Sequence, residues 1–575
     1  MSRLISSALS IRRDPRLLKL PPYLSLLCII GGIAWLFLLP LNDYSRRTYI
    51  SENALLPGQV HTYFAGSDQN VFRGYKHEID GLAGKSNYEI NDYLEALLKS
   101  FGMKVGRQNY TYESSGSEYA GENLYAILQA PRGDATEAIV LVAAWENTDG
   151  MRNTMGVPLA LTLARYFKRW SLWSKDIILV MPPDSTTGTQ AWVDAYHDAH
   201  DPARVASLPL KSGALQGAIA IDFAQQHRFK NIHIVYDGVN GQLPNLDLIN
   251  AVNSISNGQM HMPTLIQNMW KHSDKYDDRL RTMLRGMLKQ GLGYASGPHS
   301  SFIPYHVDAV TLQPFGDGWQ DEMAMGPSFF YLLMNKDRFV SIGTYLPSAM
   351  ILAANFSIMS IFFWVKSGHR EPGHGLEKSR SGSGSAGSTT VQRELFVPLL
   401  AVTISQFLGV FPLFLFNHLP ANVLSVAFSA FAVLNCALPS VLSYILKTAY
   451  QPTLQHYQLI KCFSLLLLGM FLSALATLNF SLAFFIGLLA SPLTFMQPWP
   501  KNDFARYASS ALLQLVSPTA VMFSATAFFG LDVGEVLRDA AFGWNVWGMY
   551  TPVVIWCVWW PAWIAGSVMV LGPTS

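Results

Sequence analysis

The stretch IVLVAAWENTDGMRNTMGVPLALTLARYF, residues 139–167, decides the fold of the soluble part of this chain. It begins with an apolar run typical of a buried strand, continues through a polar loop and ends with apolar residues spaced as in an amphipathic helix. The loop contains asparagine and aspartate but no histidine, since none occurs between His77 and His197. A strand, a loop and a helix in this order predict an α/β unit with a parallel sheet.

Alternating strands and helices continue this pattern along the chain. Strands are predicted at 139–145, 176–181, 218–223 and 231–236, and helices at 91–101, 155–170, 189–200, 246–254 and 277–290. The alternation predicts a mostly parallel sheet covered by helices on both faces. Side chains at the carboxyl ends of such strands are expected to line the functional crevice.

Composition divides the chain into a soluble part and a membrane part. Of its 575 residues, 50% are hydrophobic and only 14% are charged, against roughly 25% charged in an ordinary soluble protein. Long apolar runs fill the sequence from Leu395 onward, whereas residues 42–340 have a normal soluble mixture. The net charge of +2 gives no reason to expect nucleic acid as a partner. These features predict a membrane protein with one large water-exposed domain.

Eight apolar segments are predicted to span the membrane as a helical bundle. They cover residues 23–41, 342–365, 395–416, 421–446, 458–478, 481–497, 508–530 and 550–571. The N-terminal tail, 1–22, carries five basic residues and one acid, which places it in the cytoplasm.

The remaining links follow from that orientation. The basic link 366–394, with its flexible SGSGSAGS core, is also cytoplasmic, and the domain 42–340 lies on the far side. Six further spans occupy 395–575, and both chain ends are cytoplasmic. The break between the fifth and sixth spans, near Asn479, stays open.

Two kinds of side chain bear on the far-side domain. Asn109 begins the glycosylation sequon Asn-Tyr-Thr, which agrees with exposure to a lumen. All cysteines lie in apolar segments: Cys28, Cys436, Cys462 and Cys557. The domain therefore has neither an internal disulfide nor a cysteine nucleophile.

Three stretches resemble zinc-dependent exopeptidases: KDIILVMPPDSTTGTQAW, GAIAIDF and GPHSSFIPYHVDAVTL. The resemblance implies that vestigial metal-site positions fall at Asn153, Asp184, Asp222 and His299. Asp222 and His299 keep ligand chemistry. Asn153 stands in place of a bridging aspartate, Asp184 and Ser185 replace paired glutamates, and Trp145 or Ala144 replaces the first histidine.

A two-metal site needs about five or six anionic or imidazole groups to hold and bridge its ions. Two surviving groups cannot hold a metal pair, so neither a metal nor another cofactor is expected. Asp222 and His299 are interpreted as hydrogen-bonded remnants, with one weakly bound ion as the alternative. Asn153 and Asp184 are interpreted as loop and helix-capping residues.

Three further stretches are more specific: YDGVNGQLPNLDLINAV (236–252), SKDIILVMPPDSTTGTQAWVDAYHD (174–198) and PSFFYLLMNKDRFVSIGTYLP (327–347). They resemble the anchor-attachment subunit of the glycosylphosphatidylinositol (GPI) transamidase of the endoplasmic-reticulum membrane. The resemblance implies a non-catalytic component that helps hold the GPI glycolipid. A separate caspase-like subunit would supply the cysteine, and the proprotein substrate would reach this chain through the complex.

Two segments are predicted to contact the anchor. Ser51, Glu52 and Asn53 follow the first span, where Glu52 would pair with an amine and Asn53 with sugar hydroxyls. The alternative is a polar cap at the end of a span. Trp556, Trp560 and Pro561 lie in the last span, where the proline is expected to kink the helix and the aromatic rings to line a groove for acyl chains. The alternative for tryptophans is an ordinary position at the membrane interface.

Two other functions compete with this prediction. A membrane-bound zinc aminopeptidase with a degenerate metal site would need enough ligands for at least one ion. A transporter with a large external domain would need charged residues along its path, and the six C-terminal spans carry almost none within their apolar runs.

Overall fold

The computed structural model describes residues 19–47, 66–170, 173–224, 229–269, 272–320, 331–368, 393–499 and 502–572. The chain divides into two compact units. The α/β unit comprises Phe37–Tyr345 and Arg538–Thr551, and the helical unit comprises Met1–Leu36, Leu346–Leu537 and Pro552–Ser575. The α/β unit therefore includes a short C-terminal segment that the sequence assigned to a link between two spans.

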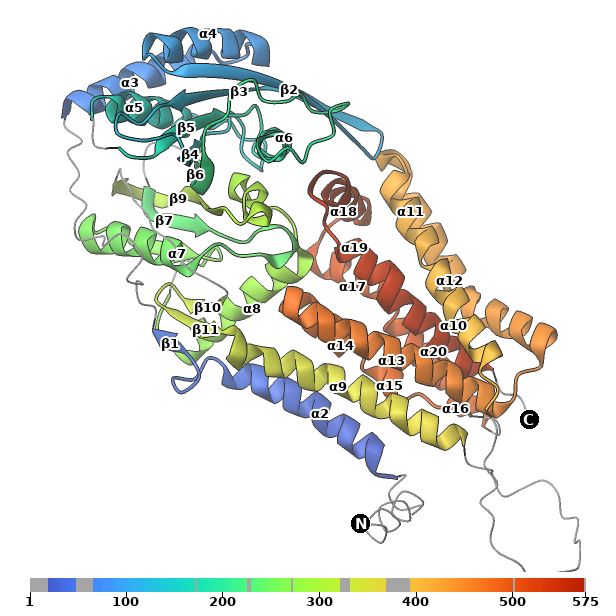
Figure 1. The fold of residues 1–575 in the computed structure, drawn as a ribbon. Coiled ribbons are helices and arrows are strands. Elements are labelled where there is room, and N and C mark those ends of the chain that lie inside the picture. The colour runs from blue at the N-terminus through green and yellow to red at the C-terminus, as the bar shows by residue number, and fades with distance from the viewer. Residues whose placement is uncertain are drawn as a thin grey trace, which may run out of the picture. The chain divides into compact units, whose positions relative to one another are not determined.

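Within the described residues, an eight-stranded sheet organises the α/β unit, in the order β2-β3-β5-β4-β6-β9-β7-β8 (Figure 1). The strands are β2 (Lys104–Ser114), β3 (Ser117–Leu128), β4 (Glu137–Val142), β5 (Asp176–Met181), β6 (Ala214–Ile221), β7 (Phe229–Val235), β8 (Thr264–Ile266) and β9 (Asp308–Gln320). The central strands β5, β4, β6 and β9 run parallel, and β7 pairs with β8 in parallel. The other pairs, β2–β3, β3–β5 and β7–β9, are antiparallel. The predicted mostly parallel α/β sheet is confirmed.

Helices cover both faces of this sheet. The helices of the unit are α3 (Gly66–Asp80), α4 (Asn87–Ser100), α5 (Gly156–Lys168), α6 (Thr187–Tyr196), α7 (Leu246–Asn253) and α8 (Tyr276–Leu292), with shorter turns η3 (Val239–Gly241), η4 (Ser254–Gln259), η5 (Pro298–Ser301) and η6 (Ile303–Tyr305). In β5, Leu179 packs with α3, α4 and α5, whereas Ile178 and Val180 pack with α6 on the opposite face. This alternation is the period of two that a strand buried on both faces requires.

Two sequence signals explain elements whose bounds differ from the prediction. The helix expected at 91–101 begins earlier as α4, because Ser86 and Glu89 form a reciprocal capping box at its start. The β2–β3 hairpin was not predicted. Its turn residues Ser115 and Gly116 have φ values of 51° and 75°, as a two-residue hairpin turn requires.

The C-terminal part of helix α18 (Val533–Trp547) packs within the α/β unit. The rings of Phe542 and Tyr119 meet with centroids 4.9 Å apart, and Asn545 donates to Ser114 Oγ at 3.2 Å. A smaller sheet completes this unit from β1 (Arg46–Arg47), β11 (Arg338–Ser341) and β10 (Tyr331–Asn335). The α/β unit therefore joins segments from both ends of the chain.

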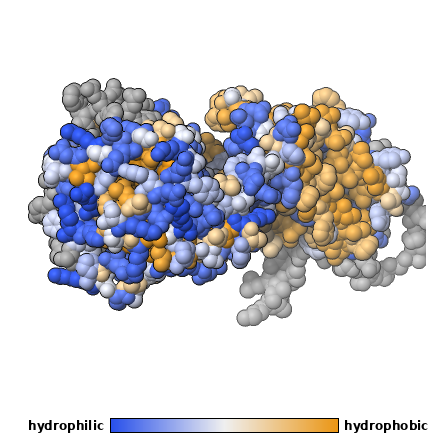
Figure 2. All heavy atoms as spheres, turned by 90° about the horizontal axis from the view of Figure 1, so that it is seen from above, coloured by the Kyte–Doolittle hydropathy of each residue, from blue (hydrophilic) through white to orange (hydrophobic). Residues whose placement is uncertain are grey.

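The helical unit contains most of the apolar helices. Its elements are α2 (Leu20–Leu38), α9 (Ile342–Ser367), α10 (Phe396–Leu408), α11 (Val410–His418), α12 (Ala421–Tyr450), α13 (Leu454–Leu478), α14 (Phe480–Ala490), α15 (Pro492–Phe495), α16 (Asp503–Leu515), α17 (Pro518–Phe529), α19 (Thr551–Val554), η7 (Ile555–Trp559) and α20 (Trp560–Leu571), of which α2, α9 and α19 extend a few residues into the other unit. Figure 2 shows apolar residues over much of the visible face of this unit, whereas the visible face of the α/β unit is mostly hydrophilic.

Six helices among the described residues are long and apolar enough to cross a membrane, and a seventh span results if α16 and α17, which bend by 52°, count as one. The segment Phe480–Phe495 is a shorter apolar helix. The predicted bundle of membrane helices is confirmed, and its count of eight is approximate. The difference comes from the bend between α16 and α17 and from the short length of Phe480–Phe495.

Gly409, the residue between α10 and α11 in the candidate span Phe396–His418, lies against the last span. A Cβ atom on Gly409 would lie 2.2 Å from the Trp556 backbone oxygen, which cannot move aside as a flexible side chain would. We expect Gly409→Ala to destabilise the purified protein by about 1–3 kcal/mol, as overpacked cores do.

The measurement is the thermal midpoint in detergent. The matched control is Gly31→Ala, whose Cβ would lie 3.9 Å from Ile351, an ordinary contact. Equal midpoints for the two variants would contradict this close packing.

Candidate functional site

The vestigial metal-site positions follow parallel strands. Asn153 follows β4, Asp184 follows β5 and Asp222 follows β6, so their loops meet at the carboxyl edge of the sheet, where ligands bind in open α/β folds. His299 lies in η5, just before β9. What these four side chains bind decides whether this edge can hold a metal.

Asn153 connects two strands and a helix through its amide. Its Nδ2 donates to the backbone oxygens of Ala144, at 3.0 Å, and Ile221, at 2.8 Å. Its Oδ1 accepts from the backbone nitrogens of Gly156, at 3.0 Å, and Phe223, at 2.8 Å. An aspartate has no donor for the two carbonyl oxygens, so asparagine suits this position and a carboxylate does not.

Asp184 accepts hydrogen bonds from the backbone at the start of α6. Its carboxylate accepts from the backbone nitrogens of Thr186, at 2.8 Å, and Thr187, at 2.6 Å. It also accepts from the Tyr110 hydroxyl at 2.7 Å. A carboxylate satisfies the free N–H groups at a helix N-terminus and is stabilised by the helix dipole. The lone pairs of Asp184 are thus occupied by hydrogen bonds within the fold.

His299 is fully buried, and both of its ring nitrogens lie within hydrogen-bond distance of a partner. Nδ1 lies 2.7 Å from Thr311 Oγ1, and Nε2 lies 3.1 Å from the Asp237 backbone oxygen. Burial disfavours the charged imidazolium and lowers the pKa of His299 to about 3. The side chain is a neutral structural residue that joins η5, β9 and the segment after β7.

Asp222 is the remaining carboxylate. Its Oδ2 accepts from Gln313 Nε2 at 2.7 Å, and its buried Oδ1 meets no hydrogen-bond donor at standard geometry within the part of the chain that the structure describes. Burial raises the pKa of Asp222, and the hydrogen bond from Gln313 offsets part of this effect. One carboxylate oxygen alone is not a zinc site, which takes at least three protein ligands.

The residues at this edge do not fit the metal pair that a zinc exopeptidase would hold. Within the ranges that the structure describes, no group of three His, Cys, Asp or Glu side chains could hold a metal ion. Asn153, Asp184 and His299 are committed to internal hydrogen bonds, which leaves only part of Asp222 available.

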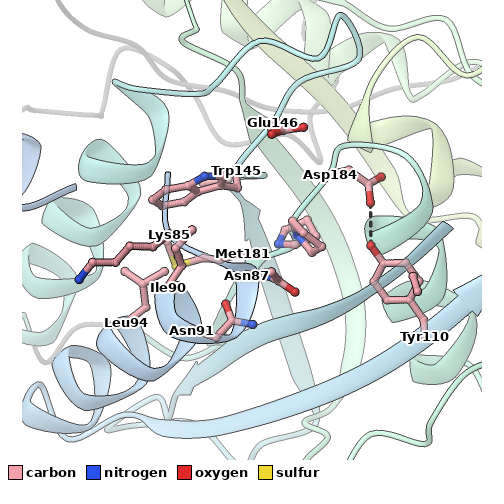
Figure 3. A pocket seen from close by; sticks show the side chains of 14 residues that line it. Lys85, Asn87, Ile90, Asn91, Leu94, Tyr110, Trp145, Glu146, Met181 and Asp184 are labelled. Atoms are coloured by element: carbon pink, nitrogen blue, oxygen red, sulfur yellow. Dashed lines mark hydrogen bonds between the residues drawn. The ribbon is translucent and has the colours of Figure 1, made fainter. Parts of the chain in front are cut away.

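A pocket of about 220 Å³ lies beside this edge. Its lining residues come from α4, β2, β3 and the loops after β4 and β5: Lys85, Asn87, Ile90, Asn91, Leu94, Tyr110, Ala120, Ala143, Trp145, Glu146, Met181, Pro182, Pro183 and Asp184. Figure 3 shows Asn87 and Asn91 on the side opposite Trp145 and Glu146. The pocket is thus formed where the crevice of the fold is expected.

In the helical unit, the last span contains a π-helical turn, and Trp556, one of the three predicted anchor residues, lies within it. This turn, η7, directly precedes Trp560 and Pro561. Trp556 and Trp560 are buried, and Trp556 packs against the rings of Phe416 and Phe431 at centroid distances of 5.4 and 5.7 Å. The rings that were expected to line a groove for acyl chains lie in an aromatic core.

Three helix interruptions meet at this core. Gly409, at the break between α10 and α11, approaches the Trp556 backbone oxygen. Asn435 of α12 donates to Thr519 at the bend between α16 and α17, at 3.0 Å, and accepts from Trp560 Nε1 at 2.9 Å. Trp563 Nε1 donates at 2.6 Å to the Leu513 backbone oxygen near the end of α16. We call these residues the break junction: Gly409, Asn435, Leu513, Thr519, Trp556, Trp560 and Trp563.

Comparison with protein families identifies the chain. The family model described as Gaa1-like, GPI transamidase component, matches residues 120–328 and 327–567, which together cover most of the chain. The chain belongs to the Gaa1-like family. GPI transamidase component GAA1 of Saccharomyces cerevisiae is 32% identical over 507 residues, which cover 84% of this chain and 76% of that protein. Its counterpart gaa1 of Schizosaccharomyces pombe is 30% identical over 507 residues, which cover 82% and 81%.

The solved structures that resemble this Gaa1-like chain cover part of it, at low identity. A zinc-dependent exopeptidase from Parabacteroides distasonis is 13% identical, with a TM-score of 0.26, and covers 49% of this chain and 94% of its own. A glutaminyl cyclase from Fimbriiglobus ruber is 14% identical, with a TM-score of 0.30, and covers 45% and 88%. Scores of this size add nothing to the fold that the strand order defines.

The remaining predicted positions of the Gaa1-like chain have different outcomes. Ser51, Glu52 and Asn53 lie outside the described residues. Asn109 lies on β2 with its side chain exposed. The NGQLPNLD stretch, interpreted as a turn followed by a helix cap, forms η3 and the start of α7, where Asn245 Oδ1 accepts from the Asp247 backbone nitrogen.

Sequence reasoning missed a second role of that turn. Asn240 has a φ of 59° and exchanges two hydrogen bonds with the segment before the last span: its Nδ2 donates to Gly548 O at 3.2 Å, and its Oδ1 accepts from Tyr550 N at 2.9 Å. Thr551 Oγ1 donates to Leu292 O nearby at 3.1 Å. The positive φ favours asparagine, and no sequence pattern shows that residues so far apart in the chain meet.

The Asn153 hydrogen bonds predict a sensitive substitution. Asn153→Asp removes both donors and places a carboxylate against the oxygens of Ala144 and Ile221. We expect a loss of about 2–5 kcal/mol in the free energy of unfolding, because two buried carbonyls lose their partners beside a buried charge.

The measurement is thermal unfolding of the purified full chain. The matched control is Asn502→Asp, because Asn502 only accepts a hydrogen bond as the cap of α16, a role that aspartate also fills. Equal stability of the two variants would show that Asn153 does not hold the strand ends together.

Proposed function

We propose that this Gaa1-like chain is a non-catalytic component of the GPI transamidase that binds and positions the GPI lipid through its helical unit. In this proposal the α/β unit is lumenal in the endoplasmic reticulum, and both termini are cytoplasmic. The cysteine nucleophile belongs to a caspase-like subunit, and the proprotein meets the lipid within the complex.

The break junction is the observation that carries the lipid role. Helix breaks in an apolar bundle leave backbone groups without intrahelical partners, and such groups are tolerated only where protein covers them or a cavity needs them. Interrupted membrane helices are also a recurrent construction of binding sites in membrane proteins. Three interruptions that share one polar and aromatic network favour a functional over a purely structural explanation.

The side chains of the α/β unit support the non-catalytic part of the proposal. Three of its four vestigial metal-site positions are occupied by hydrogen bonds of the fold, as described above. Every cysteine of the chain lies in an apolar helix: Cys28 in α2, Cys436 in α12, Cys462 in α13 and Cys557 in the last span. The described residues of the α/β unit therefore offer no ligand set for the metal pair of an exopeptidase, and the unit contains no cysteine.

Positioning alone is a large contribution to such a reaction. Holding an amine next to an activated carbonyl replaces a bimolecular encounter with an intramolecular one, for which effective molarities reach about 10⁵–10⁸ M. A component that restrains the lipid would thus favour transfer to the lipid amine over attack by water. Ser51, Glu52 and Asn53 remain our proposed headgroup contacts, and Asn109 remains a proposed glycosylation site.

Trp560→Phe tests the lipid role directly. Phenylalanine keeps an aromatic ring in the core but loses the indole N–H that donates to Asn435. We expect the GPI lipid that co-purifies with the assembled complex, measured by mass spectrometry, to fall about fivefold, which corresponds to the roughly 1 kcal/mol of one buried hydrogen bond.

Trp499→Phe is the matched control, because Trp499 belongs to the same unit and is 40% exposed. The control should retain both the lipid and the other subunits. Undiminished lipid in the Trp560→Phe complex, with all subunits present, would contradict lipid positioning by the break junction.

A further inference from the structure

The pocket of the α/β unit has an apolar floor and a polar rim. Ile90, Leu94, Ala143 and Met181 line its interior and are all buried. Its 220 Å³ exceeds the space of a few water molecules and suits one large aliphatic side chain together with a small polar group. A ligand for this pocket therefore has an apolar part that enters and a polar part that stays at the rim.

The chemistry of the ligand's polar part is restricted by the hydrogen-bonding groups at the rim that are still available. Asn91 is 2% exposed and uses its Nδ2 to donate to Glu122, whereas its Oδ1 has no partner among the described residues. The Trp145 Nε1–H group and the Glu146 carboxylate likewise bind no other described side chain. Asp184 is a different case, because its carboxylate already serves α6 and Tyr110.

The indole that offers this donor is held in place. Arg152 lies over the Trp145 ring, 4.7 Å from its centroid, and donates to the Ile79 backbone oxygen at 2.7 Å. The Trp145 backbone nitrogen donates to the Pro182 oxygen at 2.8 Å. A fixed aromatic side chain with an unused N–H group loses little conformational entropy when a ligand binds.

The rim carries charges of both signs. Lys85 is positive and Glu146 is negative, and Figure 3 shows them on different sides of the pocket. Asp184 adds a second carboxylate, whose oxygens accept hydrogen bonds from Tyr110 and from the start of α6. A cation would therefore pair with Glu146 and an anion with Lys85. A neutral amide, which both donates and accepts, matches the Asn91 oxygen and the Trp145 N–H group together.

From these features we infer that the pocket binds a peptide segment, with one large aliphatic side chain on the floor and a backbone amide between Asn91 and Trp145. The segment belongs either to the proprotein or to another subunit. This inference concerns the α/β unit alone and holds whether or not the helical unit binds the lipid.

Saturation-transfer NMR on the purified full chain tests the ligand class. The probes are N-acetyl-leucine N-methylamide, the cation leucinamide and the anion 4-methylpentanoate. We expect the neutral diamide to bind with its methyl groups most strongly saturated. Trp145→Phe should weaken its binding about two- to tenfold, the effect of one lost hydrogen bond, and Glu146→Gln should leave it unchanged.

Blocking the pocket provides the control against binding to detergent. Ala120 lines the pocket and is exposed, so Ala120→Leu should abolish diamide binding without disturbing the core. Ala203→Leu, at an exposed position in a turn away from the pocket lining, should have no effect. Equal diamide signals from these two variants, or binding of leucinamide alone that Glu146→Gln abolishes, would overturn the inference.

A photo-crosslinker identifies the source of the segment. Lys85 lines the pocket and is exposed, so p-benzoylphenylalanine at this position can react with a bound ligand in the assembled complex. Adducts with proprotein peptide would identify the substrate as the occupant, and adducts with another subunit would identify an assembly contact. Lipid adducts alone, or none from a complex supplied with proprotein, would overturn the inference.

Discussion

The α/β unit depends on one amide side chain at the carboxyl edge of its sheet. Asn153 donates to the ends of two parallel segments and accepts from the start of α5 and from the chain after β6. A carboxylate at this position can bridge metal ions, but it has no N–H group and therefore cannot make the two bonds in which Asn153 is the donor. The asparagine thus ties the strand ends together directly, and Asp184 and His299 make similar structural bonds.

Hydrophobic periodicity predicted the frame of the α/β unit but not all of its parts. The predicted strand 176–181 coincides with β5, because a continuous apolar run between polar ends has few alternative structures. The β2–β3 hairpin was missed because polar side chains such as Gln108 and Asn123 occupy buried positions of its strands, so the sequence lacks the apolar alternation that predicts a strand. The place of 538–551 in this unit depends on tertiary contacts such as Phe542 with Tyr119, which no local pattern encodes.

The candidate sites show the same division. The sequence shows that Asp222 and His299 are residue types that can bind a metal ion. Only the structure shows that both ring nitrogens of His299 lie within hydrogen-bond distance of Thr311 and Asp237. From sequence alone, a tryptophan near the end of a span can be placed either at the membrane–water interface or inside the helical bundle. Only the structure shows that Trp556 and Trp560 are buried inside the helical unit. The Gaa1-like chain therefore combines an α/β unit stabilised by residues at the vestigial metal-site positions with a helical bundle whose break junction is our proposed lipid site.

The most direct test of this account is metal analysis of the purified full chain after equilibration with zinc and removal of unbound ions. Because internal hydrogen bonds occupy Asn153, Asp184 and His299, we predict well under one zinc ion per chain, with no change in His299→Ala. One or two zinc ions per chain that His299→Ala removes would show that the carboxyl edge of the sheet still holds a metal centre, and would contradict the account.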